Sequence, residues 1–412
     1  MKTFVFIKKI DRTLGAGFIF LLSKASKLFS KKKKVKIEKI LVIKFGNLGD
    51  VFFTIPALGA LDKKFSKKEI VLLTSNKTCG IYSRYPYFDR IINFNFEENK
   101  GFAKDIFFTF RNILNLIRII RKENFDTIID MENYSTFTCF LSFISDAKTR
   151  LGLDVKGTNR GLLYTHSMPC LKENRHEKDT FIELVSLIGV EAVEDNINFK
   201  RTKEEENYVD LFLKNHSISQ NDLLIGVHAG SNPEWLIKRW PKECFKELIK
   251  DIVKKYGAKV ILVGAKDEEG LIKDISSSGK NIINSAGKFN IGQLAALISR
   301  CDLFICNDSA PMHIAESVRT PIVAIMGPTN PLRWGPYGKE DIIVNRKIQC
   351  SYCRETGSVE SNCTNIECMK KIRVEDVMGA VETQIERIKK SFFSYEQIPN
   401  ILKGEELGCT IK

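Results

Sequence analysis

The sequence predicts an α/β fold with two domains, each a parallel sheet with helices on both faces. Short apolar runs alternate with segments of helical spacing, and this alternation pauses near the middle of the chain before it starts again. The length of 412 residues exceeds what one ordinary core accommodates, and it suits two domains of about 150–200 residues each. We therefore expect two Rossmann-like domains that face each other across a cleft.

The first alternation begins at residues 39–44, an apolar run of the kind that forms a buried parallel strand. A glycine-containing turn follows, and helical spacing resumes at 51–64. Further along this half we expect strands at 70–74, 91–94 and 127–130 and a long helix at 104–124.

Charged and polar residues dominate 193–220, which we interpret as the passage between the domains. The boundaries are placed at 38–205 for the N-terminal domain and 218–385 for the C-terminal domain, with a tail at 386–412. In the second domain we expect strands at 223–228, 259–263, 303–306 and 322–326 and helices at 242–256 and 291–299.

The segment 1–37 precedes the first domain and combines an apolar stripe with many lysines. The stripe includes Phe18 and Leu21, and four lysines follow at 31–34. This pattern is typical of a basic amphipathic helix lying in a membrane interface; the alternative is a solvated basic arm packed on the body. No run approaches the roughly 18 apolar residues of a spanning helix, and no signal cleavage site is evident. We expect a cytoplasmic protein, peripheral at the cytoplasmic face of the inner membrane.

The charge balance is basic, with 64 Lys+Arg against 50 Asp+Glu and a net charge of +14. Such a balance suits anionic partners without choosing among them. No nucleic-acid-binding motif is recognisable, so nucleic acid is not an expected partner.

The 11 cysteines are odd in number and scattered, which argues against a secreted disulfide scaffold. Cys301 and Cys306 lie in an apolar run and are expected to be buried.

A glycine-containing turn, Gly46-Asn47-Leu48-Gly49-Asp50, follows the first predicted strand. Ligands of open α/β sheets bind at the carboxyl ends of the strands, so Asp50 is expected to point into the cleft. The alternative is that Asp50 only caps the next helix, because Asp is a favoured N-cap residue.

Two further segments have the same strand–turn–helix context in the second half. One runs from Gly230-Ser231 to Lys238-Arg239-Trp240-Pro241, and the other is 307–313, which contains Asp308 and His313. Backbone N–H groups at a helix start favour phosphate, and a nearby cation adds attraction. The alternatives are a solvated loop cation at Lys238 and a structural histidine at His313.

Together with Gly327–Thr329 and Arg333–Pro336, these segments resemble glycosyltransferase family 9, the heptosyltransferases of lipopolysaccharide core assembly. The order and spacing of the motifs match over residues 38–385. The resemblance implies a GT-B fold with an N-terminal acceptor domain and a C-terminal donor domain. It also implies an inverting transfer of heptose from ADP-heptose to a lipid-linked core oligosaccharide.

The resemblance assigns roles to individual residues. Asp50 is implied as the general base and Lys238 as the cation that neutralises the leaving diphosphate. Gly46, Asn47 and Gly49 form the acceptor-side loop. The implied donor-binding residues are Gly230, Ser231, Lys238, Asp267, Glu268, Asp308, Ser309, Ala310 and His313. Which acidic residue of the 264–268 turn meets the ribose is left open. An acceptor pocket is expected around 76–86 and 131–160, where Arg150, Lys156 and Arg160 are candidate contacts to phosphorylated sugars; the alternative is that they are solvated surface charges.

No Asp-x-Asp pair occurs in the chain, so no catalytic metal or other cofactor is expected, and cations and helix N-termini would stabilise the leaving group. Cys350, Cys353, Cys363 and Cys368 have the spacing of a four-thiolate metal site. Structural zinc, a redox-sensitive or disulfide pair, and free thiols all remain open there. Two other functions also stay open: transfer from a different nucleotide sugar, and a non-catalytic nucleotide- or nucleic-acid-binding module.

Overall fold

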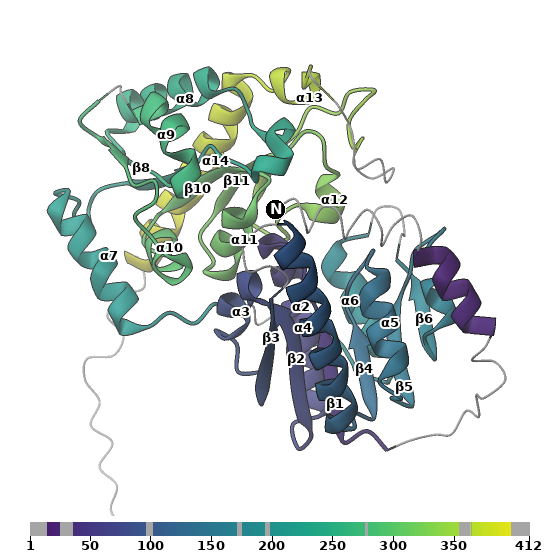
Figure 1. The fold of residues 1–412 in the computed structure, drawn as a ribbon. Helices are drawn as coiled ribbons and strands as arrows, with labels where there is room; N and C mark the ends of the chain where they lie inside the picture. Colours follow the sequence, from purple (N-terminus) through teal and green to yellow (C-terminus); the bar gives the residue numbers. More distant parts are fainter. Residues whose placement is uncertain are drawn as a thin grey trace, which may run out of the picture. The chain divides into compact units, whose positions relative to one another are not determined.

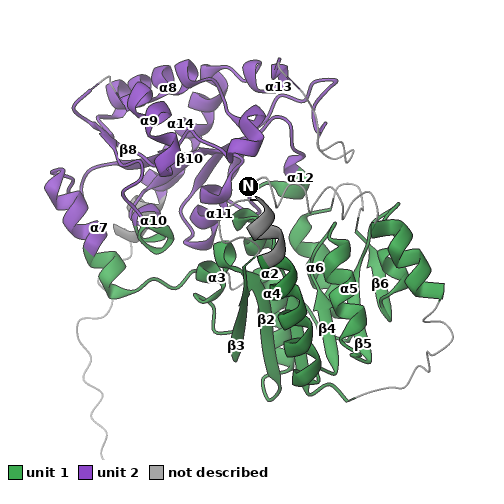
Figure 2. Ribbon diagram, viewed as in Figure 1, with its two compact units in different colours: residues 1–207, 290–296, 332–335 green, residues 208–289, 297–331, 336–412 purple. Residues whose placement is uncertain are grey.

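The computed structural model divides into two compact units (Figure 2). Unit 1 comprises residues 1–207, 290–296 and 332–335, and unit 2 comprises the remainder, 208–289, 297–331 and 336–412. The residues that the structure describes are 15–24, 36–95, 102–170, 175–193, 198–276, 279–353, 363 and 365–396.

Unit 1 is built on a six-stranded parallel sheet with the order β3-β2-β1-β4-β5-β6 (Figure 1). Its strands are β1 (Lys39–Ile43), β2 (Glu69–Ser75), β3 (Arg90–Phe94), β4 (Thr127–Asp130), β5 (Thr149–Asp154) and β6 (His166–Pro169). The central strand β1 pairs with β2 on one side and with β4 on the other. Residues 40–43 are fully buried, as expected of a strand covered on both faces.

The helices of unit 1 either connect the strands β1 to β5 in turn or follow β6. They are α2 (Leu48–Lys64), α3 (Asn76–Tyr82), α4 (Phe102–Glu123), α5 (Thr136–Ile144), α6 (Glu177–Ser186) and α7 (Lys203–Asn215), the last of which continues into unit 2. Ten residues of α2 are buried, and α2 packs against α6. A core cluster combines β1, β2, β4, α4 and α5, with Leu41 and Leu116 among its members.

Unit 2 repeats the same plan with the strand order β12-β11-β10-β7-β8-β9, again entirely parallel. Its strands are β7 (Leu224–His228), β8 (Lys259–Leu262), β9 (Ile282–Asn284), β10 (Leu303–Asn307), β11 (Ile322–Ile325) and β12 (Ile342–Val344). Its main helices are α8 (Lys242–Tyr256), α9 (Glu269–Ser276), α10 (Ile291–Ile298), α11 (Ala310–Ser317), α13 (Glu367–Lys370) and α14 (Val374–Glu396), although 291–296 of α10 group with unit 1. Trp240 is almost fully buried in its core, where its indole nitrogen donates to Ile372 O at 2.8 Å.

The structure confirms the predicted fold class, because both sheets are parallel and each has the doubly wound Rossmann strand order. The buried positions of Cys301 and Cys306 are also confirmed. Several elements went unpredicted because their apolar patterns are short or weak. They are α3, α5, β5, β6 and α6 in unit 1 and α9, β9, β12 and α14 in unit 2.

Residues 15–24 form a helix that packs on unit 1. Ile19 is fully buried beside Cys139 and Leu163, whereas Phe20 and Leu21 are 45% and 68% exposed. The rest of the predicted amphipathic segment, 1–14 and 25–35, lies outside the described residues. In the part of the chain that the structure describes, no helix is both long and apolar enough to span a membrane.

The expectation that Arg160 meets an anionic ligand is wrong. Its side chain is fully buried, and Nη2 lies 2.9 Å from Oδ2 of the equally buried Asp130. The hydroxyl of Tyr164 donates to the same oxygen at 2.6 Å. A buried carboxylate requires a paired cation, and this need holds Arg160 inside. Arg150 also bonds within the unit, donating from Nε to Leu163 O at 3.1 Å.

Candidate active site

Each sheet has one topological switch point, between β1 and β4 in unit 1 and between β7 and β10 in unit 2. At such a point the connections leave the two central strands in opposite directions, which opens a crevice at the strands' carboxyl ends. The motif 46–50 follows β1, and the segments beginning at Ala229 and at Asp308 follow β7 and β10. The predicted motifs therefore lie at the ligand-binding edges of their own sheets.

In unit 1 the Gly46 turn is held by Glu132, which follows β4. Oε1 of Glu132 accepts hydrogen bonds from Phe45 N at 2.6 Å and Gly46 N at 2.8 Å. Burial is the strongest influence on this carboxyl and opposes its ionisation, but the nearby Lys44 and the two amides outweigh it and lower the pKa of Glu132. Nζ of Lys44 in turn donates to Met131 O at 2.9 Å. The turn is thereby fixed by an ionised carboxylate from the neighbouring strand.

Asp50 lies in the first turn of α2, three residues after the N-cap Asn47. Its Oδ2 accepts from Asn47 N at 3.0 Å and from Asn47 Nδ2 at 3.2 Å. The helix thus begins at Leu48, three residues earlier than predicted, because the Asp50 carboxylate satisfies an amide at the helix start. The alternative N-cap role belongs to Asn47 and not to Asp50. Asp50 remains partly exposed, so it has both a helix-capping contact and access to solvent.

In unit 2 the amide of Asn307, at the end of β10, joins the two phosphate-binding candidates. Its Nδ2 donates to Ala229 O at 2.9 Å and Gly230 O at 3.1 Å. Its Oδ1 accepts from Trp240 N at 3.1 Å. The side chain is fully buried, so these bonds fix the 229–230 turn relative to the Trp240 segment.

Lys238 and Asp308 are brought together although 70 positions separate them in sequence. Nζ of Lys238 lies 2.7 Å from Oδ2 of Asp308, and Thr329 Oγ1 donates to the same oxygen at 2.6 Å. Burial opposes ionisation of Asp308 most strongly, but Lys238 and Thr329 outweigh it and lower the pKa. Lys238 is therefore no solvated loop cation. Its ammonium group stands at the carboxyl edge of β10, where α11 begins.

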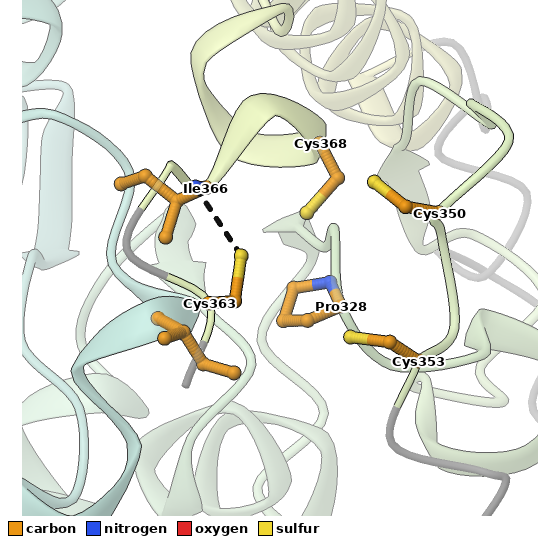
Figure 3. A pocket seen from close by; sticks show the side chains of 7 residues that line it. Pro328, Cys350, Cys353, Cys363, Ile366 and Cys368 are labelled. Carbon is orange, nitrogen blue, oxygen red and sulfur yellow. Dashed lines mark hydrogen bonds between the residues drawn. The ribbon is translucent and has the colours of Figure 1, made fainter. Parts of the chain in front are cut away.

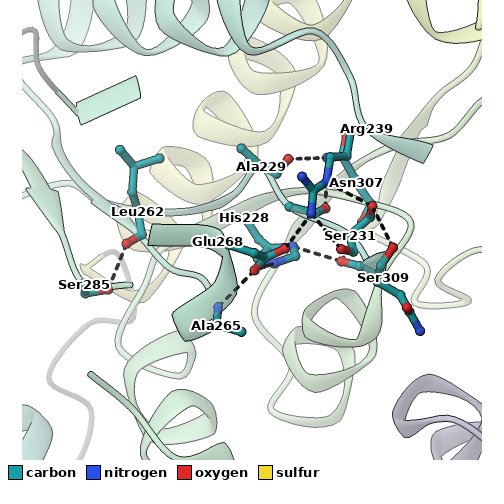
Figure 4. Close-up of polar contacts among 12 residues, drawn as sticks. His228, Ala229, Ser231, Arg239, Leu262, Ala265, Glu268, Ser285, Asn307 and Ser309 are labelled. Atoms are coloured by element: carbon teal, nitrogen blue, oxygen red, sulfur yellow. Dashed lines mark hydrogen bonds and ion pairs between the residues drawn. The ribbon is translucent and has the colours of Figure 1, made fainter. Parts of the chain in front are cut away.

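Ser309, His228 and Glu268 form a chain of hydrogen bonds at the same edge (Figure 4). Ser309 Oγ lies 3.0 Å from His228 Nδ1, and His228 Nε2 lies 3.2 Å from Glu268 Oε2. Gly230 leaves room for this arrangement, because a Cβ there would overlap the Glu268 carboxylate. The histidine is thus oriented by a buried carboxylate and in turn orients a hydroxyl.

The same carboxylate receives contacts from two other segments. Ala265 N donates to Glu268 Oε2 at 2.9 Å, and Arg239 Nη2 lies 3.5 Å from Oε1. Arg239 Nε also donates to Ser231 Oγ at 3.1 Å. Glu268 is only 5% exposed, whereas its neighbour Asp267 is exposed to solvent. Of the two acidic candidates in the turn, Glu268 belongs to the switch-point network.

Helix α11 begins directly after this chain and presents its N-terminus to the switch point. Ser309 is the N-cap residue, but its hydroxyl bonds to His228 and makes no capping bond to the helix. Ala310 occupies the first helical position; Pro311 after it has no N–H, and Met312 N donates to Ser309 O at 3.0 Å, so the backbone N–H groups available at this helix start are those of Ser309 and Ala310. His313 is buried one turn later, with Nδ1 3.4 Å from Glu316 Oε2. Such a helix start is suited to bind a phosphate group.

The segment 332–335 groups with unit 1 rather than with the sheet of unit 2. Nη2 of Arg333 lies 3.0 Å from Oε2 of Glu177 at the start of α6, and both side chains are buried. Trp334 packs edge-on against Phe53, with ring centroids 5.6 Å apart. The segment that begins the Arg333–Pro336 motif is therefore anchored by a buried ion pair.

Sequence reasoning missed Glu132, His228, Asn307, Thr329 and the Glu177–Arg333 pair. Glu132, His228 and Glu177 lie outside the motifs, whereas Asn307, Thr329 and Arg333 lie within them but were given no role of their own. A polar residue directly after a buried parallel strand was the available signal, since it marks the ligand edge of the sheet.

Two doubly wound sheets, with a cationic helix start at the switch point of one and a carboxylate at that of the other, define a GT-B glycosyltransferase. Comparison with known proteins agrees. The family model for glycosyltransferase family 9 (heptosyltransferase) matches residues 113–364, more than half of the chain. The chain therefore belongs to glycosyltransferase family 9.

Individual relatives align with most of the chain. The lipopolysaccharide core heptosyltransferase OpsX of Haemophilus influenzae is 24% identical over 356 residues, which cover 84% of this chain and 96% of that protein. A family 9 glycosyltransferase from Veillonella parvula has a TM-score of 0.72 at 25% identity, covering 87% of this chain and all of that one. The Escherichia coli ADP-heptose lipopolysaccharide heptosyltransferase II has a TM-score of 0.66 at 18% identity, covering 85% and 99%.

Proposed function

We propose that this glycosyltransferase moves heptose from ADP-heptose onto a lipid-linked lipopolysaccharide core acceptor, with inversion and without a catalytic metal. The observation that carries the proposal is the juxtaposition of Lys238, Asp308 and the start of α11 at the switch point of unit 2. A nucleoside diphosphate is the leaving group that such a cationic helix start is suited to stabilise. Heptose, ADP and the core acceptor are supported by the matched family, by OpsX, a lipopolysaccharide core heptosyltransferase, and by the E. coli ADP-heptose lipopolysaccharide heptosyltransferase II.

On the donor side, we assign the diphosphate to the amides at the start of α11 and to Lys238. Gly230 and Ser231 follow β7, whose last residue, His228, contacts the hydroxyl of Ser309. Glu268 has carboxylate oxygens at the same edge and is the acidic residue we assign to the ribose. Asp308 holds the Lys238 ammonium in position and does not itself contact the phosphate, because like charges repel.

On the acceptor side, we assign the general base to Asp50. As the acceptor oxygen attacks the anomeric carbon, the bond from that carbon to the diphosphate oxygen breaks, and the acceptor's proton passes to the Asp50 carboxylate. The leaving diphosphate keeps the electron pair, and Lys238 offsets its charge. The Gly46 turn, fixed by Glu132, lies close against Asp50, since a Cβ on Gly46 would come within 3.3 Å of Asp50 Oδ2.

We further propose that the enzyme works at the cytoplasmic face of the inner membrane, where a lipid-linked acceptor is accessible. The exposed Phe20 and Leu21 on the 15–24 helix support this proposal, because Ile19 already anchors the helix to the body and leaves those side chains in water.

The donor assignment is tested by titrating the purified full-length protein with ADP, UDP, GDP and CMP in the absence of added metal. We expect ADP to bind most tightly, and a heptosyl-transfer assay with core acceptors then follows. Selective binding of UDP or GDP would change the proposed donor to a UDP-sugar or a GDP-sugar and would leave the proposed mechanism unchanged. Binding of none of the four would overturn the donor proposal and favour a non-catalytic module.

A further inference from the structure

The cysteine cluster of unit 2, defined as Cys350, Cys353, Cys363 and Cys368, lines a single cavity (Figure 3). The cavity has a volume of about 150 Å³, and its other lining residues are Ile237, Pro328 and Ile366. The lining therefore combines four thiols with apolar side chains and no carboxylate. Two loops bring the thiols together across the nine positions that separate Cys353 from Cys363.

Each of the two cysteine loops contains a non-glycine residue in the left-handed region. Tyr352 has a φ of 65° and directly precedes Cys353, and Ile366 has a φ of 45° between Cys363 and Cys368. For a β-branched isoleucine this conformation is a true outlier, and such strain persists where the surroundings require it. The same turn directs Ile366 N to donate to Cys363 Sγ at 3.4 Å. An amide aimed at a sulfur stabilises negative charge on it, as in metal-thiolate sites.

The cavity adjoins both loops that hold the donor-site cation. Ile237 precedes Lys238, and Pro328 precedes Thr329, whose hydroxyl donates to Asp308. Gly327 packs directly against the second cysteine loop, since a Cβ on it would come within 3.1 Å of Cys368 Sγ and even closer to Met369 Sδ. Whatever fixes the cysteine loops therefore also fixes the segments that carry Lys238 and Thr329.

We propose that the cysteine cluster binds one thiophilic divalent cation, Zn²⁺ or Fe²⁺, in a closed structural site that holds the Lys238 and Thr329 loops. Soft sulfur ligands select such ions over Mg²⁺ or Ca²⁺, which require oxygen. Four protein ligands leave no open position for substrate, so the ion takes no part in the transfer reaction. Binding converts four thiols to thiolates and releases their four protons.

Binding requires a local rearrangement of the thiols. Among the described residues, no three His, Cys, Asp or Glu side chains stand close enough together to hold a metal ion as they are. With metal–sulfur distances of about 2.3 Å, neighbouring sulfurs of a tetrahedron lie about 3.8 Å apart. Rotation of the thiols into the shared cavity supplies this approach, and among the described cysteines no disulfide opposes it.

The test begins with metal analysis and native mass spectrometry of the full-length protein purified without added metal or chelator. We expect one Zn²⁺ or Fe²⁺ per chain, and the analysis itself distinguishes the two. Thiol titration is expected to show the four cluster thiols shielded until a chelator removes the ion. Cobalt(II) added to the stripped protein is expected to give thiolate-to-metal charge-transfer absorption.

Variants then assign the ion to the cluster. Cys350→Ser and Cys363→Ser are expected to lower metal affinity at least about tenfold, whereas Cys244→Ser, outside the cluster, keeps it. If a cluster variant does not fold, chelator-stripped wild-type protein replaces it, with circular dichroism as the fold check. Stripping is also expected to weaken ADP binding by loosening the Lys238 loop.

Three results overturn the proposal: a metal-free native protein that gives no cobalt charge-transfer band, a disulfide within the cluster, or metal retained by both cluster variants. Because metal content is measured without substrate, these results are independent of the donor assignment. A protein that binds metal but not ADP contradicts only the proposed function.

Discussion

Nζ of Lys238 lies 2.7 Å from Oδ2 of Asp308, and the pair is largely buried at the start of α11. Each side chain neutralises the charge of the other, which the fold has largely shielded from water. The pair also orients the ammonium before substrate arrives, so less ordering remains to be done when a diphosphate binds. Removing one partner therefore affects stability and binding together, and removing both separates the two effects.

For Lys238→Met we expect a loss of about 3 kcal/mol in the free energy of unfolding, because Asp308 is left buried with the hydrogen bond from Thr329 but without the Lys238 cation. ADP affinity is expected to fall as well. Urea denaturation and calorimetric titration measure the two quantities. The double variant Lys238→Met/Asp308→Asn is expected to regain most of the stability but none of the affinity. Recovery of ADP binding in the double variant would contradict the role given to Lys238.

Replacing Asp50 with Asn separates helix capping from proton transfer. The amide oxygen still accepts from Asn47 N, so the melting temperature is expected to change little. An amide cannot take up the acceptor's proton, and kcat is expected to fall by about 10²–10⁴-fold. ADP affinity, measured on the same preparation, is the internal control and should stay near the wild-type value. Wild-type turnover in Asp50→Asn would remove Asp50 from the mechanism.

Gly230→Ala is expected to destabilise unit 2 and weaken donor binding, because the new Cβ displaces the Glu268 carboxylate from His228. Gly270→Ala is the matched control, since no atom lies within 4 Å of its added Cβ and helix α9 favours alanine by about 1 kcal/mol. Thermal unfolding and ADP titration of both variants provide the comparison. Equal melting temperatures of Gly230→Ala and Gly270→Ala would show that the Glu268 carboxylate can move away from the new Cβ without loss of stability.

The stability of unit 2 is expected to depend on pH through Asp341. Burial, and then the charge of Glu316, raises the pKa of Asp341 from 3.8 to about 7. The folded chain therefore holds a proton between these values that the unfolded chain has released, and the free energy of unfolding falls as pH rises through this window. The side chain of Asn does not titrate in this range, so Asp341→Asn lacks this pH dependence.

Denaturation of wild type and Asp341→Asn at about pH 5 and about pH 8 measures this contribution. The wild type is expected to lose stability relative to the variant at the higher pH. A stability difference that is independent of pH would contradict the raised pKa.

Membrane binding is expected to depend on the exposed side chains of the 15–24 helix. The double variant Phe20→Ser/Leu21→Ser removes apolar contact while keeping the buried anchor Ile19. Sedimentation with vesicles containing anionic lipid is expected to decrease. Phe110→Ser, which changes a 59% exposed side chain on α4, is the control and should bind as wild type does. Unchanged sedimentation of the double variant would exclude this helix as the membrane contact.

The sequence by itself determined the fold class and the neighbourhood of the site. Buried strands such as 39–43 and 303–307 can be recognised in the sequence because they are continuous apolar runs. The turns that follow such strands mark the carboxyl edge of a parallel sheet. Strand β6 lacks that signal because only one of its four residues, Met168, is buried, and β12 is only three residues long.

Only the tertiary structure decided which side chains meet. In the sequence, Arg160 and Lys238 are both basic residues that could bind an anionic ligand. In the structure, Arg160 is buried in an ion pair with Asp130, whereas Lys238 lies at a helix start beside Asp308. Glu132 and Asn307 acquire their roles from backbone amides and carbonyls more than 70 positions away. The physical reason is that local pattern fixes which face of an element is apolar, whereas a polar group's charge and partners depend on what the folded chain places around it.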